Sequence, residues 1–176
     1  MWNNVYSGDI IDSPSKLYSI SILNPPLDAH HWSTNNSSIV MQISIPVSKH
    51  DSVSLLMTGD IERTAEYRMI ENFLLTNIDL LKVSHHGSAT STTQAFLSAT
   101  KPKDAVVSRG KWYASRNELS LNKVTKRLSV NGINHYITVD SGAILFESDF
   151  NNGNPKWNKI EWRNPSFAQW LFANNR

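Results

Sequence analysis

The chain of 176 residues contains no cysteine. It can therefore form neither disulfide bonds nor thiolate metal sites, and any metal must be held by histidine, carboxylates or water. No apolar run approaches the roughly 20 residues that a membrane-spanning helix needs. The first residues, Met1-Trp2-Asn3-Asn4, lack the basic region and the apolar core of a secretory signal. These absences predict a chain that is soluble when it is taken alone.

Histidine is also scarce, and its spacing excludes one kind of site. The six histidines form no H-x-H pair, and no H-x-H-x-D-H run occurs; they are His30, His31, His50, His85, His86 and His135. A catalytic metal normally takes at least three protein ligands, and a two-metal site takes more, so most ligands of such a site are absent. Apolar residues make up 40% and charged residues 18% of the chain, which predicts a globular domain.

The net charge of +2 is small, but the charges are unevenly distributed. Residues 1–100 carry five basic and nine acidic side chains, a net charge of −4. Residues 101–127 carry eight basic and two acidic side chains, a net charge of +6. A basic segment of this kind can guide a phosphate backbone. It is also typical of a solvated helix face with a loop, and charge alone leaves both interpretations open.

Two apolar runs, residues 55–57 and 80–83, each end in a turn that carries metal-type ligands. The first is followed by Thr58-Gly59-Asp60 and the second by Ser84-His85-His86-Gly87-Ser88. Zinc and manganese accept carboxylate and imidazole ligands, and α/β proteins build sites beyond the carboxyl ends of strands. The sequence therefore predicts part of a metal site at Asp60 and the histidine pair. The alternative is a turn or helix-capping carboxylate beside ordinary loop histidines.

The order of the predicted elements favours a mixed α/β fold. Strands are predicted at 17–24, 38–45 and 53–57, and a helix with an apolar face follows Asp60. Next come a strand at 78–83, a short helix at 92–99, a strand at 104–108 and a helix at 118–130. A hairpin is predicted at 133–148, across Asp140-Ser141-Gly142. We expect a mixed sheet with flanking helices.

Residues 151–176 form a tail that differs from the predicted domain at 1–150. The tail holds half of the six tryptophans together with four basic residues. Such a tail often packs back onto its own domain. Tryptophan combined with basic residues can also mark a membrane interface or a surface that stacks against nucleic-acid bases. The sequence leaves these alternatives open.

The motifs at the predicted strand ends resemble those of one known family. Thr58-Gly59-Asp60, an amphipathic helix and then Leu81-Lys82-Val83-Ser84-His85-His86-Gly87-Ser88 with Thr90-Ser91 are similar to the metallo-β-lactamase-fold domain of ComEC competence proteins. The similarity is to the C-terminal half of that domain and covers about residues 17–148. It implies a partial αββα sandwich, in which two β-sheets pack face to face, helices lie outside and metals sit at the strand ends.

The resemblance also implies roles for single residues. Asp60 would bridge two divalent metals, zinc or manganese. Either His85 or His86 would bind one of these metals, while the other histidine would contact the phosphate or donate a proton. Ser88 and Thr90 would contact the phosphate or support the metal ligands. In this interpretation Asp60 and both histidines are the catalytic residues.

The function that the resemblance implies is DNA uptake in natural transformation. The family domain lies on the extracytoplasmic face of the bacterial inner membrane and is thought to hydrolyse the DNA strand that does not enter the cell. Arg109 and Lys111 in the basic segment are candidate substrate contacts. Because the H-x-H-x-D-H half is absent, the sequence leaves enzymatic activity of this chain open. The expected partners are DNA, that N-terminal half and a membrane channel domain.

An incomplete sheet would expose strand edges and apolar faces, so the sequence also predicts self-association. The alternative function is that of a non-catalytic module of the same fold, which would bind DNA or a membrane surface through the basic segment and the tail.

Overall fold

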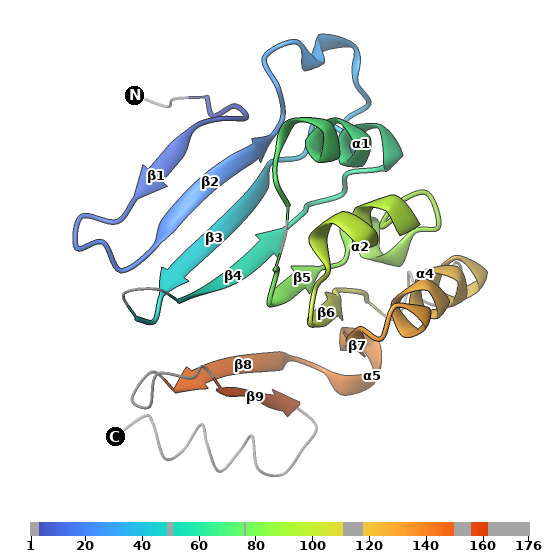
Figure 1. The fold of residues 1–176 in the computed structure, drawn as a ribbon. Coiled ribbons are helices and arrows are strands. Elements are labelled where there is room, and N and C mark those ends of the chain that lie inside the picture. Colours follow the sequence, from blue (N-terminus) through green and yellow to red (C-terminus); the bar gives the residue numbers. More distant parts are fainter. Residues whose placement is uncertain (1–3, 49–50, 76, 111–117, 150–155, 162–176) are drawn as a thin grey trace.

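A computed structural model describes residues 4–48, 51–75, 77–110, 118–149 and 156–161. Seven strands form one sheet in chain order, and helices lie beside it (Figure 1). These strands are β1 (Ile10–Asp12), β2 (Ser19–Asn24), β3 (Val40–Pro46), β4 (Ser52–Met57), β5 (Leu80–Lys82), β6 (Asp104–Val107) and β7 (Asn134–Ile137). The remaining elements are the helices α1 (Arg63–Asn72), α2 (Gln94–Thr100), α4 (Glu118–Val130) and α5 (Thr138–Ser141), the 3₁₀ turns Ala29–His31 and Ser84–Gly87, and the strands β8 (Ile144–Asp149) and β9 (Lys156–Glu161).

The large sheet has an antiparallel half and a parallel half. Strands β1 to β4 run antiparallel, whereas β4 to β7 run parallel. Parallel neighbours need a long crossover connection, and α1, α2 and α4 lie in these three connections. The sequence prediction of a mixed α/β sheet with flanking helices is confirmed. Among the described residues, no helix has both the length and the apolar character that crossing a bilayer requires.

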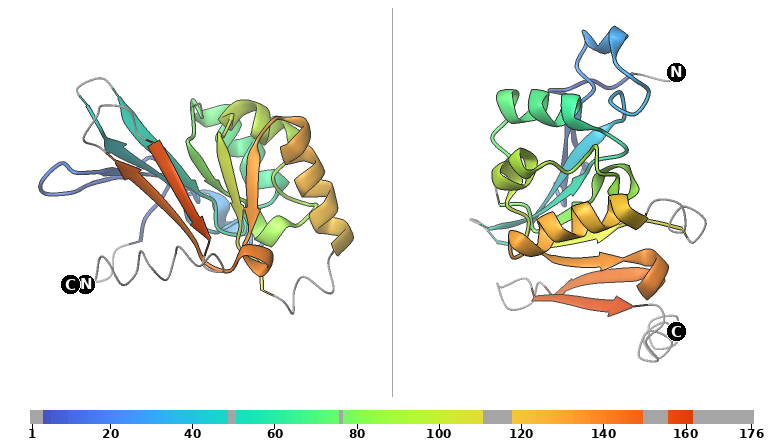
Figure 2. Two further views of the ribbon diagram at one scale, coloured as in Figure 1. Left: turned by 90° about the horizontal axis from the view of Figure 1, so that it is seen from below. Right: turned by 90° about the vertical axis from the view of Figure 1, so that its right-hand side faces the viewer.

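The hydrophobic core lies between the sheet and these three helices. Leu56 and Leu81 are cross-strand partners on this face of the sheet. They belong to one cluster with Met69 of α1, Phe96 of α2 and Leu128 of α4, and none of the five is more than 1% exposed. Full burial of a side chain of this size contributes roughly 1.5–3 kcal/mol. The left view of Figure 2 shows the helices grouped on one side of the sheet.

The opposite face of the sheet is apolar but only partly covered. Met41 and Ile43 of β3 lie on this face together with Met57 of β4, and all three side chains are half-buried. Tyr136 of β7 is on the same face and contacts Phe146 of β8, with ring centroids 5.8 Å apart. The two-stranded sheet of β8 and β9 therefore lies on the side away from the helices (Figure 2).

The last strands pair differently from the sequence prediction. The hairpin predicted at 133–148 is wrong, because β7 pairs with β6 in parallel and β8 pairs with β9 in antiparallel. The residues between β7 and β8 form the short helix α5, and the N–H of Gly142 donates to the carbonyl of Thr138 over 2.8 Å. This helical turn directs the chain from one sheet to the other. Strand β9 lies within the tail, so this part of the tail pairs with β8.

Candidate functional site

The candidate site lies where β4 and β5 end side by side. Met57, the last residue of β4, is the parallel partner of Lys82, the last residue of β5. Asp60 follows the first strand and the histidine pair follows the second, so the topology brings them to one edge of the sheet. The Nε2 atom of His86 lies 3.4 Å from Oδ2 of Asp60. The structure thus brings together an aspartate and a histidine that are 26 positions apart in the sequence.

The turn after β4 fixes where the Asp60 carboxylate lies. Gly59 has a φ of +57°, and a Cβ at this position would meet the Cβ of Ser38 at 2.6 Å. The N–H of Asp60 donates to Oγ of Ser38 over 3.1 Å. Asn24 holds Ser38 in turn, because its buried side-chain amide donates to the carbonyl oxygens of Asn36 and Ser38 over 2.8 and 2.7 Å. The turn is therefore tied to the loop before β3.

The backbone of the histidine turn is strained. His85 and His86 both have left-handed backbone angles, with φ of 46° and 52°, and Gly87 follows with φ of 79°. Non-glycine residues in this region cost of order 1–3 kcal/mol each and persist only where the surroundings hold them. Here the N–H of His85 donates to the carbonyl of Gly59 over 3.2 Å, and the N–H of Ser88 donates to the carbonyl of His85 over 2.9 Å. Strain of this kind clusters at functional sites, which supports a function for this turn.

The two histidine rings face different carboxylates. The rings are edge-on to each other, with centroids 6.5 Å apart. His86 faces Asp60, whereas Nδ1 of His85 lies 3.3 Å from Oε1 of Glu62. This Nδ1 atom is buried and has no hydrogen-bond partner among the described residues. The site therefore holds two carboxylate–imidazole pairs, and the sequence analysis missed Glu62 because its position indicated only the polar face of a helix.

A backbone contact orients the ring of His86. Nδ1 of His86 lies 2.7 Å from the carbonyl oxygen of Ser108, which follows β6. A carbonyl can only accept a hydrogen bond, so Nδ1 carries the proton and Nε2 is the atom directed toward Asp60. Neutral Nε2 facing a carboxylate oxygen would be repulsive, and a second proton or a cation removes that repulsion. Metal-binding histidines are commonly oriented by such a bond from the other ring nitrogen.

Lys82 supplies a positive charge next to Asp60. Its Nζ atom donates to the carbonyl of Gly59 over 3.0 Å and lies 4.0 Å from Oδ1 of Asp60. Burial lowers the pKa of Lys82, while the charge of Asp60 acts in the opposite direction. Lys82 therefore offsets part of the negative charge on one oxygen of Asp60, and His86 faces the other oxygen.

The predicted hydroxyl contacts, Ser88 and Thr90, are linked to Glu62. Thr90 Oγ1 donates to Oε1 of Glu62 over 2.6 Å and lies 2.9 Å from Oγ of Ser88. Glu62 also directly precedes α1, and its N–H donates to the side-chain oxygen of Asn36 over 2.9 Å. A chain of contacts therefore runs from Ser88 through Thr90 and Glu62 to His85.

Of the two basic residues predicted to contact the substrate, Arg109 and Lys111, the structure describes only Arg109. Arg109 is 4% exposed, and its guanidinium donates to the carbonyl of His86 over 3.3 Å. Its backbone N–H donates to Oγ1 of Thr138 over 2.8 Å. Arg109 thus lies under the histidine turn and supports it. Lys111 lies outside the described residues.

The Asp60–His86 pair has the spacing of two metal ligands. Two atoms bound tetrahedrally to zinc at about 2.1 Å lie about 3.4 Å from each other, and the observed separation is 3.4 Å. Within the described part of the chain, no group of three or more histidine and acidic side chains is placed to hold a metal ion. The residues present fit a divalent metal as a pair of ligands, and further ligands would have to come from elsewhere.

Several curated proteins are similar to the chain over part of its length. ComE operon protein 3 of Bacillus subtilis is 33% identical over 114 residues, which is 65% of this chain and 14% of that protein. Recombination protein 2 of Haemophilus influenzae is 46% identical over 59 residues, which is 34% of this chain and 7% of that protein. Competence protein ComA of Neisseria gonorrhoeae is 30% identical over 124 residues, or 69% of this chain and 17% of that protein.

The chain therefore spans 7% to 17% of the length of these relatives. No protein-family model matches it.

Proposed function

We propose that this chain serves DNA uptake in natural transformation, as the C-terminal part of a hydrolase domain like that of ComEC proteins. The observation that carries the proposal is the meeting of Asp60 and His86 at two adjacent strand ends, 3.4 Å apart. The name of one relative, Competence protein ComA, supports the link to competence. The substrate in this proposal is DNA, and the reaction is hydrolysis of a phosphodiester bond.

The arrangement of the sheet and helices supports the proposal that the chain forms half of an αββα sandwich. Helices cover one face of the seven-stranded sheet, while the half-buried side chains of Met41, Ile43 and Met57 lie on the other face. In the sandwich proposed here, a second sheet packs against this apolar face. Two sheets packed in this way are about 10 Å apart.

In this proposal Asp60 and His86 hold a divalent metal, zinc or manganese. Such an ion lowers the pKa of bound water and neutralises charge on the phosphate. The hydrogen bond to Ser108 keeps Nε2 of His86 directed toward Asp60. The remaining ligands are assigned to an H-x-H-x-D-H segment that this chain lacks, so this segment is the proposed partner.

The second carboxylate–imidazole pair is assigned to proton transfer. Glu62 lies 3.3 Å from Nδ1 of His85 with no hydrogen bond between them, and in this proposal the contact shortens when the substrate binds, so that a proton can pass. The Thr90 hydroxyl donates to Glu62 and the Ser88 hydroxyl lies 2.9 Å from that of Thr90, so in this proposal the two hydroxyls orient the Glu62 carboxylate. Arg109 keeps the histidine turn in place from below.

The proposed location follows from the proposed function. A domain that acts on incoming DNA works on the extracytoplasmic face of the inner membrane, next to a membrane channel domain. Such a channel would receive one strand while this domain degrades the other.

A reconstitution experiment tests the proposal. The chain is mixed with a separately produced segment that carries the H-x-H-x-D-H run, and cleavage of labelled DNA is followed with and without manganese or zinc. Asp60→Ala is expected to lower the rate at least about 100-fold, since even side chains that only orient metal ligands contribute about 10–100-fold.

Asp12→Ala is the matched control, because Asp12 is an exposed carboxylate on the edge strand β1. It is expected to leave the rate unchanged. Metal-dependent cleavage that survives Asp60→Ala would contradict the proposal.

A second candidate function is a non-catalytic module that binds DNA or a membrane surface. The small number of metal-type ligands in the described part of the chain favours it. A chelator titration separates the two candidates. A loss of thermal stability or of DNA binding on chelation favours the metal site, whereas indifference to the chelator favours the module.

A further inference from the structure

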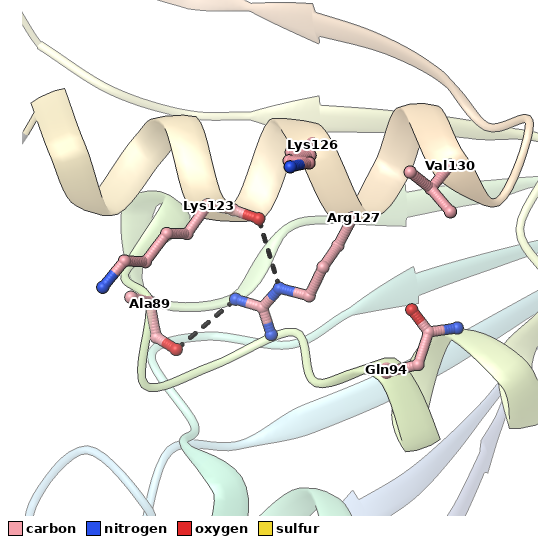
Figure 3. A pocket seen from close by; sticks show the side chains of 6 residues that line it. All are labelled: Ala89, Gln94, Lys123, Lys126, Arg127 and Val130. Carbon is pink, nitrogen blue, oxygen red and sulfur yellow. Dashed lines mark hydrogen bonds between the residues drawn. The ribbon is translucent and has the colours of Figure 1, made fainter.

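A groove lies next to the histidine turn, between α4 and the loop before α2. It has a volume of about 380 Å³ and is lined by Ala89, Gln94, Lys123, Lys126, Arg127 and Val130 (Figure 3). Ala89 directly follows Ser88, so one wall of this groove, here called the α4 groove, continues the loop of the candidate site. The volume falls within the range of small-molecule sites, about 300–1,000 Å³.

Arg127 joins α4 to the loop of the candidate site. Its Nη2 atom donates to the carbonyl of Ala89 over 3.4 Å, and its Nε atom donates to the carbonyl of Lys123 over 3.4 Å. Ser120 of the same helix accepts a hydrogen bond from the N–H of Ala89 over 2.7 Å. The charge of buried Glu66 also faces Arg127. Arg127 is therefore a positioning residue, whose charge is partly compensated.

Lys123 and Lys126 bring positive charge to the α4 groove. Both side chains are exposed. Neither has a carboxylate partner within the described part of the chain. Arg63 at the start of α1 adds positive charge near Arg127. The groove thus has a cationic rim with room for an anion.

The lining is suited to a ligand that is partly apolar. Val130 is 76% exposed, and it lines the groove together with the methyl group of Ala89 and the aliphatic stems of the two lysines. The side-chain amide of Gln94, which also lines the groove, exchanges two hydrogen bonds of 2.9 and 3.0 Å with that of Asn131. A nucleotide unit combines a flat, weakly polar base with a phosphate, and positively charged grooves track the phosphate backbone of single-stranded nucleic acid.

We propose that the α4 groove binds single-stranded nucleic acid, with Lys123 and Lys126 contacting its phosphates. This inference rests on the proposed function, because it extends the path of the DNA from the candidate site along α4. The strand passes over Ala89, so the groove positions the nucleic acid beside Asp60 and the histidine turn.

The test measures binding of the full chain to a labelled oligothymidylate by fluorescence anisotropy, with a chelator present. Lys126→Glu and Lys123→Glu are each expected to weaken binding about tenfold at 0.1 M salt, because a phosphate contact becomes a repulsion. The salt-dependence slope is expected to fall by about 0.7 for each lost contact. Lys126→Gln provides a second variant that removes the charge without reversing it.

Arg68→Glu is the matched control. Arg68 lies on α1, is 45% exposed and pairs only loosely with Asp28, so the variant makes the same change in net charge on another helix. It is expected to change the affinity less than about twofold. Equal losses in the Arg68 and Lys126 variants would overturn the inference, and so would an absence of binding at low salt. Lys126-dependent binding to vesicles of anionic phospholipid, without an effect on the oligonucleotide, would assign the groove to a lipid surface and also overturn it.

The outcomes for the groove and for the proposed function are separable. The binding measurement contains a chelator and does not require hydrolysis. Binding that depends on Lys126, combined with a reconstituted domain that cuts no DNA, would reject the proposed function and keep the groove. Cleavage of limiting oligonucleotide at an unchanged rate in Lys126→Glu would reject the groove and keep the proposed function.

Discussion

The residues of the candidate site are positioned by turns that pack closely against neighbouring segments of the chain. Asp60 is set by a glycine turn against Ser38, and the histidines are set by a left-handed turn against Gly59. Few side chains fit at these positions. The geometry of the site is therefore specified by its glycines and hydroxyls as much as by its histidines and carboxylates.

Gly59→Ala is expected to be strongly destabilising. The new Cβ would lie 2.6 Å from the Cβ of Ser38, and the backbone would keep a φ of +57°. Gly132→Ala is the matched control, because Gly132 has a φ of +70° and nothing within 4 Å of the added carbon. We expect the unfolding free energy of the control to fall by about 1 kcal/mol, which is the cost of the left-handed backbone alone. For Gly59→Ala we expect the unfolding free energy to fall by at least about 2 kcal/mol.

Chemical denaturation of both variants provides the measurement. Equal losses of unfolding free energy would show that Ser38 moves aside without cost, which would contradict a fixed turn at Asp60.

Glu62 shows why residue-level prediction has a limit. In the sequence it occupies a polar position just before an apolar helical face, and nothing local distinguishes it from a solvated glutamate. Its contacts come from Thr90, which is 28 positions away, and from His85. Asp60, His85 and His86 are proposed from the sequence because their residue types and their positions in turns are visible locally, and their role stays a prediction.

Helix α1 is joined to the loop of the candidate site by a buried carboxylate. Glu66 is fully buried and accepts hydrogen bonds from the N–H groups of Thr92 and Thr93. Burial raises the pKa of Glu66, while these hydrogen bonds and the charge of Arg127 act in the opposite direction. One buried side chain of the helix thus holds the backbone of the loop at Thr92 and Thr93.

The raised pKa has a consequence for stability. The folded protein holds the proton of Glu66 more tightly than the unfolded chain, whose value is near 4.5. The stabilising contribution of that proton is complete below the unfolded pKa and is lost as the pH rises through the folded pKa. We compare the unfolding free energies of the wild type and of Glu66→Gln. The wild-type value minus the variant value is expected to increase as the pH falls from 7 to 5.

Glu71→Gln is the control, because Glu71 is exposed on the same helix. Denaturant titrations at several pH values provide the measurement. A difference between wild type and Glu66→Gln that stays constant or shrinks toward pH 5 would contradict this assignment.

The elements were predicted from the sequence better than their pairing. The helix predicted at 118–130 is confirmed at those bounds, since its apolar period is clear and Asn131-Gly132 ends it, with Gly132 at φ +70°. The hairpin predicted at 133–148 is wrong, because both of its strands exist but pair with other partners. An alternating pattern shows which side chains are buried, whereas the partner depends on where α5 directs the chain.

In the whole molecule, helices cover one face of the large sheet, whereas the other face is only partly covered. Helices cover one side of the large sheet with a continuous core, while the other side keeps half-buried methionines and isoleucines. The site lies at the end of this sheet, and the described residues give it two carboxylate–imidazole pairs. A second sheet would cover the apolar face and could bring the remaining ligands to the same edge.

The central claim is that Asp60 and His86 are ligands of a divalent metal. Calorimetric titration of manganese into the chain complemented with the H-x-H-x-D-H segment tests it most directly, with Asp60→Asn, His86→Asn and the control Asp12→Asn in parallel. We expect stoichiometric binding in the wild type and the control, and at least about 100-fold weaker binding in the two site variants. Unchanged manganese affinity in Asp60→Asn and His86→Asn would contradict the account.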